Sequence, residues 1–320
     1  MTATRVLITG ANGLVGNAVL LNLLSSDLFE PVAAVRDITK IHNLCSVEYF
    51  NLDSPYSVPS LDGVDVVIHT AAKVHVLSDF SGNAFEEFRR VNVKGTISLA
   101  ESAVKAHVKR FIFISSIKVN GESTRRGHPF KAEHRPNPLG AYALSKYEAE
   151  LALVELGKAS GMEIVIIRPP LVYGPGVKAN FLTMLNWLRR GIPLPFGAIK
   201  NRRSLVSVGN LVSLILTCIS HPSAANQIFL VSDGVDLTTT DLLRSVSKAM
   251  GKPSHLIPVP VFLLKLLLCM VGKRRLAQRL FDSLQVNIDK NKQLLGWVPS
   301  EDVNLSLQST AENHIKRIRK

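Results

Sequence analysis

The sequence TGANGLVG at residues 9–16 decides the fold, because it places three glycines between an apolar strand and a helix. We expect the strand at residues 6–8 and the helix at residues 14–24. Glycines permit a tight turn and a close backbone approach, and a helix N-terminus offers N–H groups to a pyrophosphate. In this context the segment is interpreted as a dinucleotide-binding loop, the alternative being a glycine-rich turn without a ligand. The expected cofactor contacts in the loop are Gly10, Gly13 and Gly16.

Apolar strands alternate with helices over the first half of the chain. Their continuous Val, Ile and Phe runs are typical of parallel strands covered on both faces. The sequence therefore predicts the α/β class, with a doubly wound parallel sheet of the Rossmann type. The further strands are expected at residues 32–35, 48–53, 64–69, 111–114 and 164–167, and the further helices at 92–106 and 142–156.

The pattern changes after Arg168, where prolines and glycines interrupt it and leave one short helix at residues 181–190. A last sheet strand is expected at residues 228–231. We therefore predict a dinucleotide-binding domain and a smaller, interleaved C-terminal substrate lobe. The domain would comprise residues 1–168 and about 203–235, and the lobe about 169–202 and 236–320.

Composition limits the classes of function. The 320 residues are 46% hydrophobic, and the formal net charge is +13. The basic residues are dispersed and lack interleaved aromatics, so we expect an anionic ligand and no nucleic-acid partner. Three scattered cysteines show neither metal spacing nor a disulfide framework, which predicts no metal and a reducing, cytoplasmic location. The early strand also argues against a signal peptide.

Residues 256–271 form a very apolar stretch that is interrupted by Pro258, Pro260 and Lys265. It is too short and too broken to span a bilayer. We expect a buried helix of the small lobe. The alternative is a shallow, peripheral membrane contact, helped by the neighbouring basic residues 273–275.

Three side chains form a candidate catalytic set. Tyr142 and Lys146 are four residues apart on an expected helix and therefore share a face, and Ser116 ends an apolar strand. A nearby ammonium and an oxidised nicotinamide would lower the phenol pKa. Tyr142 would then act as general acid and base, Lys146 would tune it and bind the cofactor ribose, and Ser116 would orient the substrate oxygen.

The residue after the second strand bears on the choice of cofactor. An acid there would accept the ribose 2′-hydroxyl of NAD, but this chain has Arg36. A guanidinium can pair with a 2′-phosphate, so we prefer NADP(H). NAD(H) is the alternative, with Asp37 reaching the ribose or Arg36 stacking on adenine.

In combination these motifs resemble the extended short-chain dehydrogenase/reductases, the nucleotide-sugar epimerase/dehydratase family. The resemblance spans nearly the whole chain. The matching segments are residues 9–16, 67–72, 92–96, 113–121, 142–146, 168–174 and 292–299.

The resemblance implies roles for further residues. Asp53 would contact adenine, and Arg203 and Asn180 would bind the diphosphate of a sugar nucleotide. Leu194 belongs to a short strand against which uracil would lie. Beside the glycines, Lys146 and Arg36, the implied cofactor contacts are Leu14, Asp53, Ala71, Ala72, Ser115 and Pro169. The implied substrate contacts are Ser116, Lys118, Tyr142, Asn180, Leu194 and Arg203.

Departures from the family pattern refine the expectation. Ile117 follows Ser116 where dehydratases use a Glu, and Leu171 replaces an asparagine of the galactose epimerases. Residues 116–122 and 168–178 are similar to bacterial O-antigen and surface-polysaccharide reductases. The resemblance therefore implies an NADPH-dependent 4-ketoreductase of a UDP-4-keto-6-deoxy-N-acetylhexosamine, making UDP-N-acetylquinovosamine or UDP-N-acetylfucosamine.

Two alternatives remain at this stage. One is an NAD-dependent 4-epimerase of a UDP-hexose or UDP-N-acetylhexosamine, or of a lipid-diphosphate-linked sugar. The other, from a different class, is a non-catalytic NADP(H)-binding sensor. The resemblance also implies a homodimer through the helices at residues 92–106 and 142–156.

Overall fold

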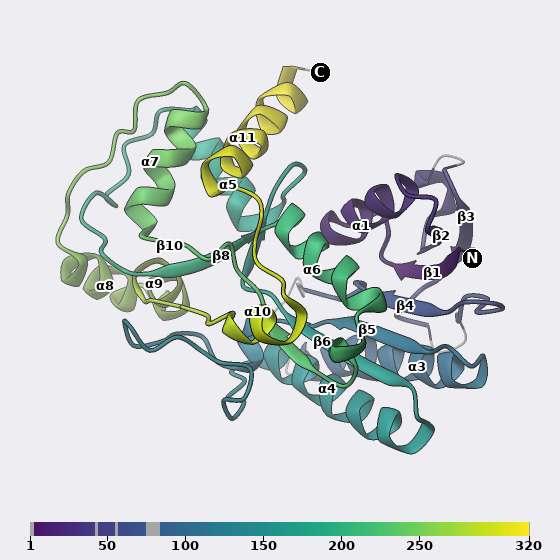
Figure 1. The fold of residues 1–320 in the computed structure, drawn as a ribbon. Coiled ribbons are helices and arrows are strands. Elements are labelled where there is room, and N and C mark those ends of the chain that lie inside the picture. Colours follow the sequence, from purple (N-terminus) through teal and green to yellow (C-terminus); the bar gives the residue numbers. More distant parts are fainter. Residues whose placement is uncertain (1–2, 42–43, 55–56, 75–83, 320) are drawn as a thin grey trace.

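The computed structural model describes residues 3–41, 44–54, 57–74 and 84–319. Its centre is a seven-stranded parallel sheet with the strand order β3-β2-β1-β4-β5-β6-β9 (Figure 1). The predicted doubly wound sheet is confirmed. The strands are β1 (Thr4–Thr9), β2 (Phe29–Val35), β3 (Ser46–Tyr49), β4 (Val66–His69), β5 (Arg110–Ile114), β6 (Glu163–Arg168) and β9 (Ile228–Leu230).

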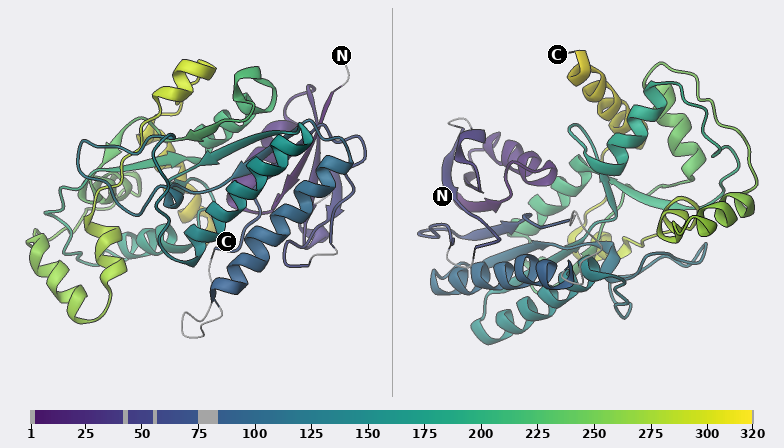
Figure 2. Two further views of the ribbon diagram at one scale, coloured as in Figure 1. Left: turned by 90° about the horizontal axis from the view of Figure 1, so that it is seen from below. Right: turned by 180° about the vertical axis from the view of Figure 1, so that it is seen from behind.

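Helices cover both faces of this sheet (Figures 1 and 2). Helices α1 (Leu14–Leu24) and α6 (Val208–Ser220) pack on one face, and α3 (Gly95–Lys105) and α4 (Ala141–Ser160) pack on the other. Successive strand residues alternate between the two cores: Ile8 joins the first and Leu7 the second. The central strands β4 and β5 are therefore buried along their whole length, which explains the continuous apolar runs.

The helix expected at residues 92–106 starts earlier and is irregular. Helix α2 (Ala84–Phe88) leads into a π-helical segment, η2 (Arg89–Lys94), which continues as α3. A π-turn inserts an extra residue into the helical ladder and often marks a functional site. Here it turns the Asn92 side chain toward the loop at Lys73, where the amide oxygen accepts from the Lys73 N–H at 2.8 Å.

A three-stranded sheet begins the C-terminal lobe. In it β8 (Arg203–Ser207) pairs in parallel with β7 (Leu171–Tyr173) and antiparallel with β10 (Asp236–Leu237). Strand β8 runs directly into α6 of the Rossmann layer. The chain thus passes back and forth between the two parts. The helices of this lobe are α5 (Ala179–Arg189), α7 (Thr239–Ala249), α8 (Val261–Met270), α9 (Arg274–Phe281) and α11 (Val303–Arg319). Helix α10 (Asp289–Leu295) packs on the large sheet near β9. The short 3-10 turns are η1 (Ile38–Lys40), η3 (Ile117–Val119) and η4 (Pro222–Ala224).

The prediction of a buried helix within residues 256–271 is wrong. Helix α8 forms there, but none of its residues is buried. Only its Val261, Leu264 and Leu268 side chains pack on a small cluster around Phe281. The stretch is apolar on all sides, and the lobe offers it a single partner surface. Among the described residues, no helix is long and apolar enough to cross a membrane.

Candidate active site

The glycine loop joins β1 to α1 with almost no free space. Gly10 has a φ of +68°, a conformation that favours glycine, and its N–H donates to Ala34 O at 3.0 Å. A side chain at Gly16 would collide with the carbonyl oxygen of Gly10. Gly13 precedes the helix without any side-chain cap, so the first-turn N–H groups of α1 stay free for an anion. This cradle fits a dinucleotide pyrophosphate.

A buried histidine ties the loop to the neighbouring strand. His69 Nδ1 lies 2.7 Å from Thr9 Oγ1, and its Nε2 lies 3.0 Å from Thr96 Oγ1. Burial, with a smaller contribution from the Lys146 charge, lowers the pKa of His69 to about 3, so the ring is neutral. The Ala71 N–H donates to Thr9 Oγ1 at 3.3 Å, which places half-buried Ala71 and Ala72 beside the loop.

The adenosine end of the expected cofactor site holds three charged residues. Arg36 directly follows β2 and is exposed. Asp37 instead caps η1, accepting from Thr39 N–H at 3.2 Å and from Thr39 Oγ1 at 2.6 Å. Asp53 forms an ion pair with Arg90. The Arg36 side chain is therefore exposed to solvent, whereas the Asp37 carboxylate is engaged by Thr39. The role of Arg36 toward a ribose stays a prediction.

Ser116, Tyr142 and Lys146 come together at the carboxyl end of the sheet. Ser116 hydrogen-bonds the Tyr142 hydroxyl, and the Phe88 ring lies edge-on to the phenol at 5.9 Å. In the protein alone, burial raises the pKa of Tyr142 to about 12, with Ser116 opposing the shift. The expected lowering is thus not present without a cofactor, because desolvation of the phenolate outweighs the available hydrogen bond.

Lys146 is almost fully buried behind the phenol. Its Nζ donates to Ile114 O at 2.9 Å and lies 4.3 Å from the centre of the Phe113 ring. Burial lowers its pKa to about 7, and Glu150 opposes this shift. The ammonium therefore depends on the few polar groups around it, because water does not solvate it.

A buried ion-pair network lies beneath this lysine, and the sequence analysis missed it. The Glu150 carboxylate accepts from Arg168 at 2.5 and 2.9 Å and from Ser115 Oγ at 2.5 Å. Arg168 also donates to Asn120 Oδ1 at 3.0 Å. Ser115, expected at the cofactor, thus directs its hydroxyl to Glu150. The position of Glu150 four residues after Lys146, on the same helix face, is the signal that could have revealed it.

Asn92 braces the same helix from the other side. Its side-chain amide donates to Lys73 O at 3.0 Å and to Ser145 Oγ at 3.1 Å. Ser145 in turn donates to Tyr142 O at 2.8 Å. This chain of bonds fixes the turn of α4 that presents the phenol.

The expected substrate residues lie in two groups. Ser116 Oγ accepts from the Lys118 N–H at 3.3 Å, and Lys118 Nζ pairs with Glu122 at 3.0 Å. Half-buried Arg203 donates to Asp282 O at 3.1 Å. Burial lowers the pKa of Arg203, while the nearby Asp282 and Glu122 charges oppose the shift. Glu122 therefore pairs with Lys118, and its charge also acts on Arg203, which the sequence analysis did not foresee.

The remaining expected residues line the approaches. Asn180 is exposed in the first turn of α5, directly after Ala179 with its positive φ of 53°. Leu194 is buried and bridges to Leu256. Pro169 is buried, and its carbonyl accepts from Ile117 N–H at 2.9 Å, directly after Ser116. Leu14, the first residue of α1, is half-buried and packs against the core of the small lobe.

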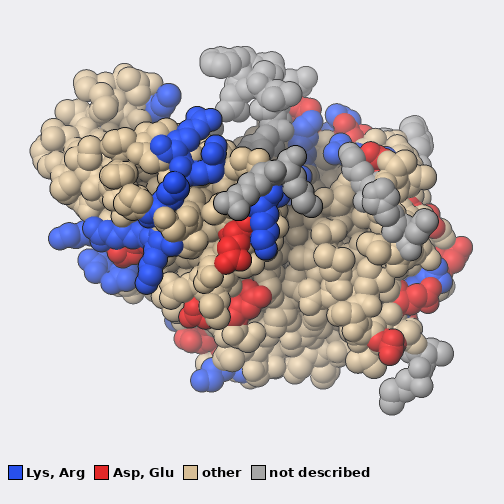
Figure 3. Space-filling model, turned by 90° about the horizontal axis from the view of Figure 1, so that it is seen from above, with Lys and Arg blue, Asp and Glu red and all other residues tan. Residues whose placement is uncertain are grey.

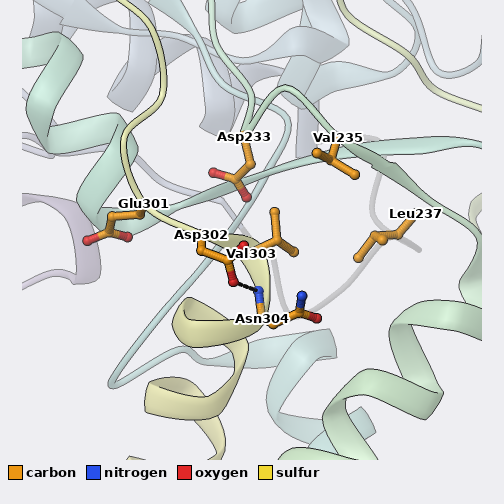
Figure 4. A pocket seen from close by; sticks show the side chains of 7 residues that line it. All are labelled: Asp233, Val235, Leu237, Glu301, Asp302, Val303 and Asn304. Atoms are coloured by element: carbon orange, nitrogen blue, oxygen red, sulfur yellow. Dashed lines mark hydrogen bonds between the residues drawn. The ribbon is translucent and has the colours of Figure 1, made fainter.

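A hollow elsewhere in the molecule carries the opposite charge to the one that a diphosphate requires. Lys and Arg side chains gather over the C-terminal lobe on the face seen from above (Figure 3). A hollow of about 210 Å³ lies elsewhere, between the segment of Asp233 and Val235 and the start of α11 (Figure 4). Its acids Asp233, Glu301 and Asp302 would repel a diphosphate. Asp233 is moreover held by the Tyr173 hydroxyl at 2.8 Å, so it serves the junction of the lobes.

A model of the NAD dependent epimerase/dehydratase family matches residues 6–232. The chain belongs to this family. The family and the assembled Ser116, Tyr142 and Lys146 set identify it as an NAD(P)-dependent enzyme. A protein from Vibrio cholerae described as UDP-glucose 4-epimerase is 46% identical to it over 310 residues, 96% of this chain and 94% of that protein.

Two further similarities are more distant. The N-acetyl-alpha-D-glucosaminyl-diphospho-ditrans,octacis-undecaprenol 4-epimerase of Escherichia coli O157:H7 is 27% identical over 81% of this chain and 77% of that protein. The crystal structure of UDP-glucuronic acid 4-epimerase from Bacillus cereus, in complex with NAD, superposes with a TM-score of 0.78. That match covers 99% of this chain and all of the other at 18% identity, and it shows the fold alone.

The lowered pKa of Lys146 predicts a pH dependence of stability. Between its folded pKa of about 7 and its ordinary 10.5, the unfolded chain binds one proton more than the folded protein. Stability therefore rises with pH in this window, by about 1.4 kcal/mol per pH unit from this group. In urea unfolding of cofactor-free protein from pH 7.5 to 9.5, Lys146→Met should remove that slope. Lys158→Met, exposed on the same helix, should keep it; parallel wild-type and Lys146→Met curves would contradict the prediction.

The Glu150–Arg168 network predicts a large loss of stability for an isosteric change. Glu150→Gln leaves the buried guanidinium of Arg168 without its counter-charge and should lower the free energy of unfolding by about 3–5 kcal/mol. Glu155→Gln is the matched control, because that exposed carboxylate pairs with the exposed Lys158 and contributes about 1 kcal/mol or less. Equal denaturation midpoints for the two variants would show that the buried pair is not needed.

Proposed function

We propose that the protein is a 4-epimerase of a UDP-linked hexose or N-acetylhexosamine. The observation that carries the proposal is the assembled pair of Tyr142 and Ser116, with buried Lys146 behind the phenol. The 46% identity to a protein described as UDP-glucose 4-epimerase, over nearly all of both chains, favours this reaction within the family. Ile117 after Ser116 disfavours the elimination chemistry of dehydratases.

The residues divide the proton chemistry at C4 between them. A bound nicotinamide dinucleotide would supply the acceptor for hydride from C4 and its return to the opposite face. Tyr142 would take the proton of the C4 hydroxyl and give it back, and Ser116 would orient that oxygen. The protonated Lys146 amine would stabilise the phenolate, whose formation burial otherwise opposes. The glycine loop would hold the pyrophosphate at the N-terminus of α1.

Arg203 and its neighbours would hold the UDP moiety. Arg203 is half-buried and already oriented by Asp282 O, so a diphosphate would form a charge-assisted pair with it at little ordering cost. Asn180 and Leu194 would contact the diphosphate and uracil, as the family resemblance implies. The main chain of Lys118 contacts Ser116, so this residue would lie at the sugar end.

Arg36 favours a second candidate, the NADPH-dependent 4-ketoreductase of a UDP-4-keto-6-deoxy-N-acetylhexosamine. The exposed guanidinium follows β2 where a ribose 2′-phosphate would lie, while Asp37 is engaged by Thr39. The same Tyr142 would then deliver a proton to the C4 oxygen in one direction only. The product, UDP-N-acetylquinovosamine or UDP-N-acetylfucosamine, would serve surface-polysaccharide or O-antigen synthesis.

We further propose a cytoplasmic homodimer that uses α3 and α4. Leu151 on α4 is 50% exposed on the outer side of this helix pair, where a second copy would cover it. The three cysteines are free, which fits a reducing compartment. The Escherichia coli relative also makes a lipid-diphosphate-linked sugar a substrate to test.

Product analysis separates the two reactions. Incubation with UDP-glucose or UDP-N-acetylglucosamine, followed by NMR, should show the C4 epimer without net consumption of NAD(H). The second assay measures NADPH absorbance with UDP-4-keto-6-deoxy-N-acetylglucosamine. Stoichiometric NADPH loss there, with no epimer in the first assay, would replace the epimerase by the reductase.

Tyr142→Phe tests the catalytic set under either reaction. Loss of the hydroxyl removes the proton carrier, so kcat should fall by about 10²–10⁴-fold while dinucleotide and UDP binding persist. Tyr147→Phe, on the same helix, is the matched control and should keep near-normal turnover. Unchanged turnover in Tyr142→Phe would overturn the assignment of the phenol.

A further inference from the structure

Helix α8 displays a broad apolar surface to solvent. Phe262, Leu266 and Met270 recur every four residues and are 68%, 56% and 69% exposed. Leu263 and Leu267, on the adjoining stripe, are 46% and 54% exposed. A soluble protein rarely exposes so many large apolar side chains side by side without a partner for them.

The surface continues beyond the helix at both ends. Ile257 before it and Val271 after it are 51% and 57% exposed. The helix lies at the outer end of the lobe, away from the large sheet (Figure 1). Its opposite face is occupied, because Val261, Leu264 and Leu268 pack on the cluster around Phe281. The packed face therefore fixes the helix on the lobe and leaves the outward face exposed.

The segment that contains this apolar surface is strongly basic. Residues 242–281 contain eight Lys or Arg and no Asp or Glu. Lys252, Lys273 and Arg279 are exposed. Of these cations, two that the structure describes face an acid: Lys265 pairs with Asp282 at 2.8 Å and Arg244 with Asp241 at 3.7 Å. An apolar stripe inside a cationic margin is complementary to lipid tails beneath anionic headgroups.

Length and charge restrict the occupant. Ten residues of helix are about 15 Å long, half of the roughly 30 Å hydrocarbon core, so α8 can lie in the interface but cannot cross it. A second copy on the same face would bring the two cationic margins together. Anionic lipid removes that repulsion and covers the apolar stripe at the same time.

We propose that α8 and its flanking cations dock the protein onto the surface of an anionic phospholipid bilayer. The helix lies in the membrane plane with Phe262, Leu266 and Met270 among the upper acyl chains. Helix α9 leads from this surface to Asp282, whose carbonyl oxygen holds Arg203. The docked lobe thus keeps the substrate side of the protein next to the membrane, and the docking does not depend on which sugar reaction the site performs.

Vesicle co-sedimentation of the full chain tests the proposal. The wild type should bind vesicles of phosphatidylcholine with about a third phosphatidylglycerol, bind pure phosphatidylcholine weakly, and dissociate at high salt. The triple variant Phe262→Ser/Leu266→Ser/Met270→Ser should partition about tenfold or more weakly. The control Leu28→Ser/Leu305→Ser changes residues that are 70% and 66% exposed elsewhere and should bind like the wild type.

Two further readouts decide the outcome. Cys269 on α8 is exposed and Cys218 is buried, so in a Cys45→Ser background an environment-sensitive dye labels Cys269 selectively. Its emission should shift to the blue when anionic vesicles are added. An unshifted dye with no sedimentation of the wild type would overturn the proposal. So would a wild-type oligomer that the triple variant dissociates, since a second copy would then cover α8. Unchanged turnover of soluble substrate by the triple variant would show that folding and chemistry are intact.

Discussion

The carboxylate of Glu150 neutralises the buried guanidinium of Arg168 at the end of β6, and its charge favours the protonated form of Lys146 one turn earlier on α4. An unpaired charge in such an interior is strongly unfavourable, so the three groups hold one another in place. Ser115 and Asn120 complete the network from the segment after β5. Helix α4 is thereby fixed against the carboxyl ends of β5 and β6. The position of the Tyr142 phenol against Ser116 follows from that attachment.

The sheet topology brings the other half of the site to the same edge. Strand β1 lies between β2 and β4. Strands β2 and β3 are added on one side of β1 and the later strands on the other, so the topological switch point lies beside the glycine loop. Ligands of open α/β sheets bind at this crevice, beyond the carboxyl ends of the strands. The buried hydrogen bonds from His69 to Thr9 and Thr96 fix the end of β1 against the end of β4. A dinucleotide at the loop would therefore extend toward Ser116 and Tyr142.

Sequence reasoning succeeded where local pattern decides structure. The continuous apolar runs predicted the parallel sheet, and the spacing of Tyr142 and Lys146 predicted their common face. It missed the Glu150–Arg168 pair, because that contact depends on how α4 settles against β6. It also placed α8 in the core, since apolar composition does not reveal whether a second partner surface exists. The lowered pKa expected for Tyr142 in the presence of a nicotinamide stays a prediction, and in the protein alone burial of the phenol raises this pKa to about 12.

The passage of the chain between the two lobes has an evolutionary consequence. Strand β8 ends at Ser207 in the small sheet, and α6 begins at the next residue in the Rossmann layer. A recombination event with a single crossover could not transfer the smaller lobe alone to another member of the family. Because β8 and α6 are contiguous, such a crossover would carry α6 and β9 of the Rossmann layer along with the lobe. Exchange of the lobe by itself would need chimeras joined at several crossovers at once.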